Sequence, residues 1–96
     1  KQAADKGYIP AIHAVGLCLL TGDRVEQDVM RAAAHFERAS EAGYPSAMYE
    51  FGLALFHGKG VPSDVPRAVY LIRASAQAGN EYAREFLLAY SLDVGT

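Results

Sequence analysis

Charge excess, cysteine and long apolar runs are all scarce in this 96-residue sequence, and each scarcity excludes a class of protein. Nine Lys and Arg are balanced by eleven Asp and Glu, so the net charge is −2 and the basic surface typical of nucleic-acid-binding proteins is missing. The longest apolar run, residues 14–20, has seven residues and contains a glycine, whereas a membrane-spanning helix needs about 20. We therefore expect neither a nucleic-acid partner nor insertion into a membrane.

Patterns typical of catalytic and metal sites are also scarce. Cys18 is the only cysteine, so an internal disulfide bond is excluded. Its apolar surroundings indicate a buried, unreactive thiol, because activation needs a basic neighbour or a helix N-terminus. No pair of histidines has the i, i+4 spacing of a helical metal site, and no Ser/His/Asp arrangement is present. We therefore expect no catalytic residue, no cofactor and no bound metal.

Small residues, in contrast, are abundant. The chain has 17 alanines and nine glycines, and 51% of its residues are apolar. This composition, with a net charge near zero, excludes a disordered chain and indicates a folded domain or part of one. The chain starts at Lys1 without a signal segment and reads as an excerpt of a longer protein, so the sequence does not identify a compartment.

The small residues follow a repeat of 36 residues. Gly7, Gly43 and Gly79 are spaced by 36, and residues 7–42 aligned without a gap to residues 43–78 give 13 identities. Repeats of this length are typical of solenoids and arrays, in which each unit packs only on its neighbours.

The repeat also predicts how the chain is divided. The four expected segments are residues 1–6, the tail helix of a preceding repeat; residues 7–42 and 43–78, two full repeats; and residues 79–96, a partial or degenerate C-terminal repeat or cap.

Each repeat is predicted to contain two helices. The first spans residues 10–21 and again 46–57, and it is closed by Gly22 or Gly58 at a position that favours left-handed backbone. The second helix begins after an aspartate and ends at the next glycine of the 36-residue series.

Two features mark the start of the second helix. Asp28 and Asp64 occupy equivalent positions where an N-cap is expected, since their side chains can accept bonds from free amides of the first turn. Pro66 then falls in the first turn, where its missing donor costs nothing. Stacked helix pairs of this kind form an all-α solenoid rather than a closed bundle.

Gly16 and Gly52 recur inside the first helix of each repeat. Glycine in a helix interior costs about 0.5–1 kcal/mol relative to alanine, so its recurrence needs a reason. We expect a close approach between helices at both places, against the small residues Ala32 and Ala68.

The second repeat resembles a Sel1-like repeat, a family related to tetratricopeptide repeats. The residues that carry the resemblance are Ala47, Gly52, Gly58, Gly60, Val61, Asp64, Ala68 and Gly79. The resemblance implies a right-handed α-solenoid of antiparallel helix pairs, here about two and a half repeats of 36 residues. It also implies a protein-interaction scaffold.

The sequence departs from this pattern in each unit, and His35 and Leu71 replace the large apolar or aromatic residue usual in the second helix. Arg24 stands where the second repeat has Gly60, so the first loop must turn without a second glycine. In the third unit, Leu88 replaces the helix glycine and Ser91 replaces an apolar residue. The third helix, predicted over residues 81–92, is therefore expected to be degenerate.

The first helices of such arrays line the concave surface, where peptides or protein segments bind. On this face a 100° helical spacing brings together aromatic, aliphatic and ionisable side chains. The candidate binding residues are His13, Leu17, Tyr49, Glu50, Leu53, His57 and Glu85. The alternative interpretation is that Leu17, Tyr49 and Leu53 complete the packing against the next repeat.

These features favour a non-catalytic scaffold or adaptor segment that binds a peptide or protein on its concave face. Two alternatives stay open: a regulatory or substrate-docking arm of a larger enzyme, and a cell-envelope module that binds a ligand or glycan. Terminal repeats leave an apolar face uncovered, so we also expect a tendency to self-associate through the exposed ends.

Overall fold

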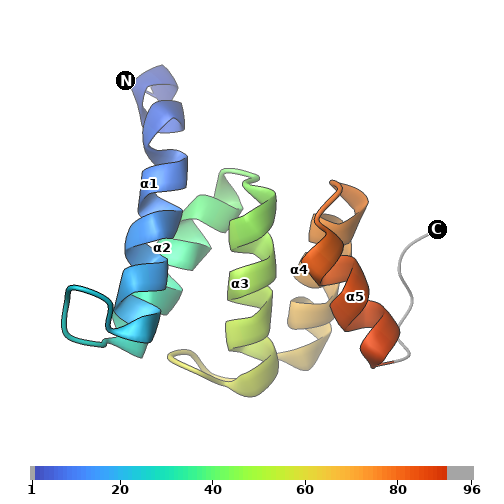
Figure 1. Ribbon diagram of the computed structural model, residues 1–96. Helices are drawn as coiled ribbons and strands as arrows, with labels where there is room; N and C mark the ends of the chain where they lie inside the picture. Colours follow the sequence, from blue (N-terminus) through green and yellow to red (C-terminus); the bar gives the residue numbers. More distant parts are fainter. Residues whose placement is uncertain (1, 91–96) are drawn as a thin grey trace.

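The computed structural model describes residues 2–90, and this part of the chain folds into five helices without a strand (Figure 1). The helices are α1 (Gln2–Thr21), α2 (Val29–Glu41), α3 (Pro45–His57), α4 (Val65–Gln77) and α5 (Glu81–Ala89). Each helix packs on the next one in the chain, and α2 and α4 lie behind a front layer of α1, α3 and α5. Two helix pairs are thus stacked, with α5 beginning a third unit, which confirms the predicted all-α solenoid.

The second helix of each repeat begins at the predicted aspartate. The Oδ1 atom of Asp28 accepts a hydrogen bond from the backbone N–H of Arg31 at 3.1 Å, and Oδ1 of Asp64 accepts one from Arg67 at 3.2 Å. These bonds satisfy amides that have no partner within the first helical turn. Pro66 lies in the first turn of α4. The predicted helix starts are therefore confirmed.

Four of the five glycines predicted to end helices do so. Gly22, Gly43, Gly58 and Gly79 have φ angles of +81°, +85°, +69° and +104°. The backbone at these places is left-handed, a conformation in which a Cβ atom is strained.

Gly7 behaves differently. Helix α1 continues through this residue from Gln2 to Thr21, so the helix end predicted at Gly7 is wrong. Glycine can adopt right-handed helical backbone as well as a left-handed turn, and α1 runs through both Gly7 and Pro10. The assignment of residues 1–6 to a preceding repeat stays a prediction.

The last helix is shorter than the segment predicted for it. Asn80 caps α5 by accepting a hydrogen bond from the backbone N–H of Tyr82 at 3.0 Å, and the helix ends at Ala89. The rest of the predicted segment, including Ser91 and Leu92, lies outside the described residues.

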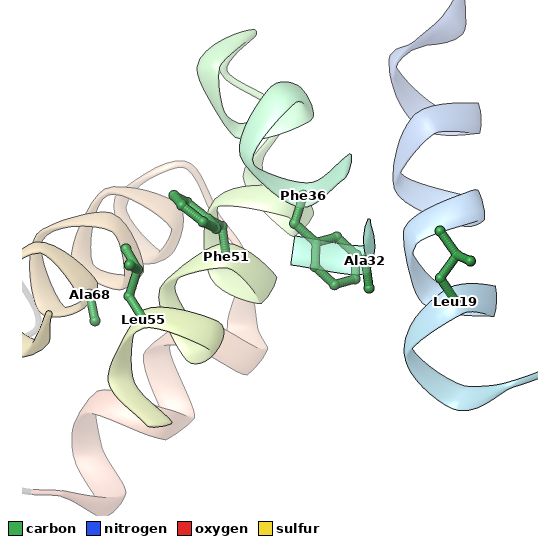
Figure 2. Close-up of a cluster of buried hydrophobic side chains, with 6 residues drawn as sticks. All are labelled: Leu19, Ala32, Phe36, Phe51, Leu55 and Ala68. Carbon is green, nitrogen blue, oxygen red and sulfur yellow. The ribbon is translucent and has the colours of Figure 1, made fainter. Parts of the chain in front are cut away.

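The core is a thin layer in which large and small side chains alternate. Its main cluster is drawn in Figure 2 and consists of Leu19, Ala32, Phe36, Phe51, Leu55 and Ala68. A second cluster, Ile72, Ala83 and Leu87, joins α4 to α5. Neighbouring helices share these clusters, so packing within each repeat and packing between adjacent repeats both contribute to stability.

The two helix glycines allow close packing within each repeat. A Cβ atom on Gly16 would lie 2.7 Å from Cε1 of Phe36, and one on Gly52 would lie 2.6 Å from Cγ1 of Ile72. The predicted close approach is thus confirmed, but the main neighbours are these large side chains. Ala68 contributes only its carbonyl oxygen, 3.2 Å from a Cβ on Gly52. The glycines pair with large residues because a ring or branched side chain fills the space that the missing Cβ leaves.

The two interhelical loops turn in the same way with different residues. Arg24 has φ +67° and Gly60 has φ +82°, so the first loop makes its left-handed turn with an arginine. At Gly60 a Cβ atom would also overlap the carbonyl oxygen of Val29 at the start of α2. Glycine is therefore required in the second loop by packing between repeats as well as by backbone conformation.

Candidate functional site

A groove opens on the front layer between α1 and α3. It holds a cavity of about 180 Å³ whose floor is formed by α2. Apolar lining comes from Leu20 of α1, Phe36 of α2, and Leu53 and Ala54 of α3. We call this cavity the front groove.

Three ionisable side chains also line the front groove, namely Glu50, His57 and Lys59. His57 and Lys59 are exposed, whereas Glu50 is half-buried. Burial disfavours the charged carboxylate and raises the pKa of Glu50. No hydrogen bond or ion pair joins Glu50 to another described residue, so its carboxylate lies in an apolar groove without a partner from this part of the chain.

Three of the seven predicted binding residues line this groove: Glu50, Leu53 and His57. Glu85 is exposed on α5 and does not line the groove. Burial raises the pKa of the Tyr49 phenol, and the negative charges of Glu50 and Glu85 raise it further.

His13 does not line the groove, and its ring packs against two aromatic rings. Its ring centroid is 5.7 Å from that of Phe36 and 5.4 Å from that of Tyr44. The buried Nε2 atom has no hydrogen-bond partner among the described residues. Burial therefore lowers the pKa of His13 and favours the neutral imidazole.

The predicted aliphatic and aromatic residues of the face take part in packing. Leu17 packs against the main core cluster, and Tyr49 and Leu53 pack against the cluster that joins α4 to α5. Tyr49 also contacts Phe86 edge-on, with centroids 6.4 Å apart. A substitution at these three residues therefore alters packing as well as the face.

An aromatic cluster fills the space between α3 and α5, and the sequence reasoning did not identify it. The ring centroids of Phe56 and Phe86 are 5.1 Å apart, and those of Phe86 and Tyr90 are 4.6 Å apart. Such contacts stabilise a fold beyond the area that they bury. The sequence signal for this cluster is the 36-residue repeat, which places these three aromatic residues on the first helices of two adjacent units.

The outer face of α1 carries a second, wider hollow of about 580 Å³. Val15, Cys18 and Val25 line it, together with Arg31 of α2. Cys18 is half-buried there, less enclosed than the buried thiol predicted from the sequence. In the second repeat α2 packs on the equivalent face of α3, whereas no helix of the described residues covers this face of α1.

The described residues contain neither a membrane-spanning helix nor a cluster of metal ligands. No helix between residues 2 and 90 is long and apolar enough to cross a membrane. No three His, Cys, Asp or Glu side chains in the described part of the chain are grouped so that they could hold a metal ion.

Stacked helix pairs with an open groove along their first helices define a helical-repeat protein of the solenoid class. The sequence matches the Sel1 repeat over residues 9–44 and 45–80, and the chain belongs to this family. Each match is 36 residues long and begins two residues after the corresponding repeat predicted from the sequence. Proteins built from Sel1 repeats are generally interaction scaffolds without catalytic activity of their own.

Several solved structures have the same fold. A Sel1 repeat protein from Oxalobacter formigenes aligns with a TM-score of 0.82 and 32% identity, over 91% of this chain and 65% of its own. The protective antigen c5321 of uropathogenic Escherichia coli, which displays an SLR fold, aligns with a TM-score of 0.80 and 30% identity, over 88% of this chain and 18% of its own.

The Helicobacter pylori cysteine rich protein B (hcpB) is similar in fold alone. It aligns with a TM-score of 0.77 and 22% identity, over 88% of this chain and 64% of its own. The chain thus spans less than two thirds of the length of each of these structures. No curated protein matches the sequence.

Proposed function

We propose that this chain is a non-catalytic scaffold segment that binds a peptide or a protein segment across the face formed by α1, α3 and α5. The observation that carries the proposal is the front groove, an apolar cavity that lies between the first helices of two adjacent repeats. Recognition grooves for peptides combine apolar pockets with a few placed polar groups, and the front groove has both.

The front groove supports this function better than the wider hollow on α1 does. The wider hollow on α1 lies at the end of the stack, on the face that a further helix covers in the second repeat. The front groove lies between two complete repeats, and both of its walls belong to the described chain.

The proposal is tested by selecting peptides from a random display library against the purified chain. The selected peptides are then measured by fluorescence anisotropy against Leu20→Phe/Ala54→Tyr, which we call the filled-groove variant. Leu20 and Ala54 pack against the edge of the main core cluster as well as lining the groove, whereas Tyr49 and Leu53 pack against the cluster that joins α4 to α5 and are left unchanged. Tyr70→Ser, at a 67% exposed side chain of α4 in the back layer, is the control.

We expect the filled-groove variant to bind at least about tenfold more weakly, because the added rings occupy the volume that the peptide would enter. Tyr70→Ser is expected to bind as the original chain does. Circular dichroism of both variants establishes that they are equally helical. If the selection yields no binder, or if the peptides bind the filled-groove variant unchanged, the proposed function is wrong.

A further inference from the structure

The front groove exists because three aromatic residues of the interface between α3 and α5 have non-aromatic equivalents at the interface between α1 and α3. Adding 36 to Leu20, Glu50 and Ala54 gives Phe56, Phe86 and Tyr90. Between α3 and α5 these three rings contact one another, with centroids 4.6 to 5.4 Å apart.

Their three equivalents all line the front groove. Between α3 and α5 the aromatic cluster fills this space. Between α1 and α3 the same space is open and forms the cavity.

Glu50 stands out among the three replacements. Phe86 shows that the fold accommodates a large apolar ring at this position, whereas Glu50 places a carboxylate there. Holding a charge partly out of water is unfavourable unless it is paired, and the half-buried Glu50 has no hydrogen-bond or ion-pair partner among the described residues. Packing thus gives no reason for an acid at this place, but recognition of a cation does.

The shape of the groove limits what the cation can be. A cavity of about 180 Å³ with apolar walls of Leu20, Leu53 and Ala54 fits a single side chain with an aliphatic stem. The carboxylate lies in the same lining and faces this space. Its chemistry matches a guanidinium, because that group is planar, binds a carboxylate through two parallel hydrogen bonds and is more weakly hydrated than an ammonium.

We infer that the front groove binds an arginine side chain of a partner peptide, with the stem against Leu20, Leu53 and Ala54 and the guanidinium paired to Glu50. The inference rests on the proposed function and names its specificity. His57 and Lys59 lie at the exposed rim of the groove, where solvent screens their charges. Lys59 carries the same sign as the ligand and opposes its binding.

The inference is tested by NMR titration of the ¹⁵N-labelled chain with small probes at pH 7. Propylguanidinium reproduces the arginine side chain, butylamine reproduces that of lysine, and butyrate and 1-butanol are the anionic and neutral controls. We expect propylguanidinium to shift the amides of Glu50, Leu53 and Ala54 with a Kd of about 1–10 mM, as suits one anchor group. Butylamine is expected to bind more weakly, and the two controls are not expected to shift these amides.

Two variants separate charge pairing from simple filling of the groove. Glu50→Gln is expected to weaken propylguanidinium binding about tenfold, because it removes the charged acceptor and keeps the shape. Lys59→Ala is expected to strengthen binding about twofold, because it removes a like charge near the site. The inference is overturned if Glu50→Gln binds unchanged, if butyrate shifts the same amides more strongly, or if butylamine binds as well as propylguanidinium.

The two proposals fail in distinguishable ways. Selected peptides that bind the front groove without any arginine, and that bind Glu50→Gln unchanged, leave the proposed function standing and overturn the arginine site. Binding of propylguanidinium at Glu50, together with a peptide selection that yields no binder, supports the arginine site and overturns binding of a peptide along the whole face.

Discussion

Two ionisable side chains of the front layer, His13 and Glu50, are held partly out of water without a partner among the described residues. Burial acts on them in opposite directions, since it lowers the pKa of the imidazole and raises the pKa of the carboxyl. In both cases the neutral form fits the folded chain better. Each therefore makes stability depend on pH, over a different range and with opposite sign.

For Glu50 the free energy of unfolding falls as the pH rises. The carboxyl of the unfolded chain ionises near its ordinary pKa of 4.5, while the folded chain keeps the proton until its raised pKa is reached. Between these values the folded state binds more protons than the unfolded state, so raising the pH destabilises the fold. We expect Glu50→Gln to be as stable as the original chain near pH 4 and more stable at pH 7.

Urea denaturation at several pH values between about 4 and 7 measures this difference. Glu85→Gln is the matched control, since it removes one negative charge from an exposed side chain on the same face. Equal gains from both variants at pH 7 would show that net charge, and not burial of Glu50, causes the effect.

For His13 the free energy of unfolding falls as the pH drops. The unfolded imidazole takes up a proton near its ordinary pKa of 6.5, while the buried ring stays neutral down to its lowered pKa. We therefore expect the original chain to lose stability relative to His13→Gln as the pH falls from about 7 to about 5. The other two histidines are present in both proteins and cancel in the comparison. Denaturation curves whose difference does not change with pH would contradict the burial of this ring.

At the scale of helices and loops, Arg24 and Gly60 make the same left-handed turn in different surroundings. A non-glycine residue in this conformation is strained by about 1–2 kcal/mol, and replacing it by glycine removes the strain. Glycine also makes the unfolded chain more flexible, which costs about 0.5–1 kcal/mol of stability. Arg24→Gly should therefore stabilise the chain by up to about 1 kcal/mol. Gly60→Arg should destabilise it by more than about 2 kcal/mol, because its Cβ would also overlap the carbonyl of Val29.

Thermal unfolding of the two single variants checks this asymmetry. The two substitutions are reciprocal, so they change the net charge by equal and opposite amounts. If the free energy of unfolding lost in Gly60→Arg is no larger than the free energy gained in Arg24→Gly, the second loop does not pack against α2 as it does in the structure.

Apart from the helix end predicted at Gly7, the helix ends and caps follow from the sequence because their causes are local. Asp28 bonds an amide three residues away, and Gly22 needs only its own backbone conformation. The surroundings of Tyr49 and Leu53, in contrast, depend on contacts between helices that are distant in the sequence. A helical spacing places both on one face of their helix, but it does not say that α5 covers that part of the face. The front groove likewise depends on which side chains meet across two repeats.

At the scale of the whole molecule, no described helix covers the outer face of α1, whereas α2 covers the equivalent face of α3. Val15 on α1 is 46% exposed, whereas its equivalent Phe51 on α3 is 2% exposed because α2 packs against it. An uncovered face of this kind gives a physical basis for self-association, which stays a prediction. The front groove is not an uncovered face of this kind, because described helices form both of its walls. It is open because the side chains at this interface are too small to fill it.

The filled-groove variant should therefore be more stable than the original chain. Leu20→Phe and Ala54→Tyr place rings in the front groove, a cavity of about 180 Å³, at the positions equivalent to two of the three rings that pack between α3 and α5. The additional buried apolar area and ring contacts are expected to contribute about 1–2 kcal/mol. For a chain of this size each kcal/mol raises Tm by about 4–8 °C, a shift that calorimetry resolves.

Ala34→Tyr is the matched control for this prediction, because Ala34 is an exposed residue of α2 outside the groove. It adds the same side chain without filling the cavity, and its lower helix propensity should reduce stability by a few tenths of a kcal/mol. A Tm of the filled-groove variant at or below that of the control would show that the two interfaces do not share one geometry. A raised Tm combined with lost peptide binding would mean that the first interface keeps a cavity at the expense of stability, as expected of a surface used for recognition.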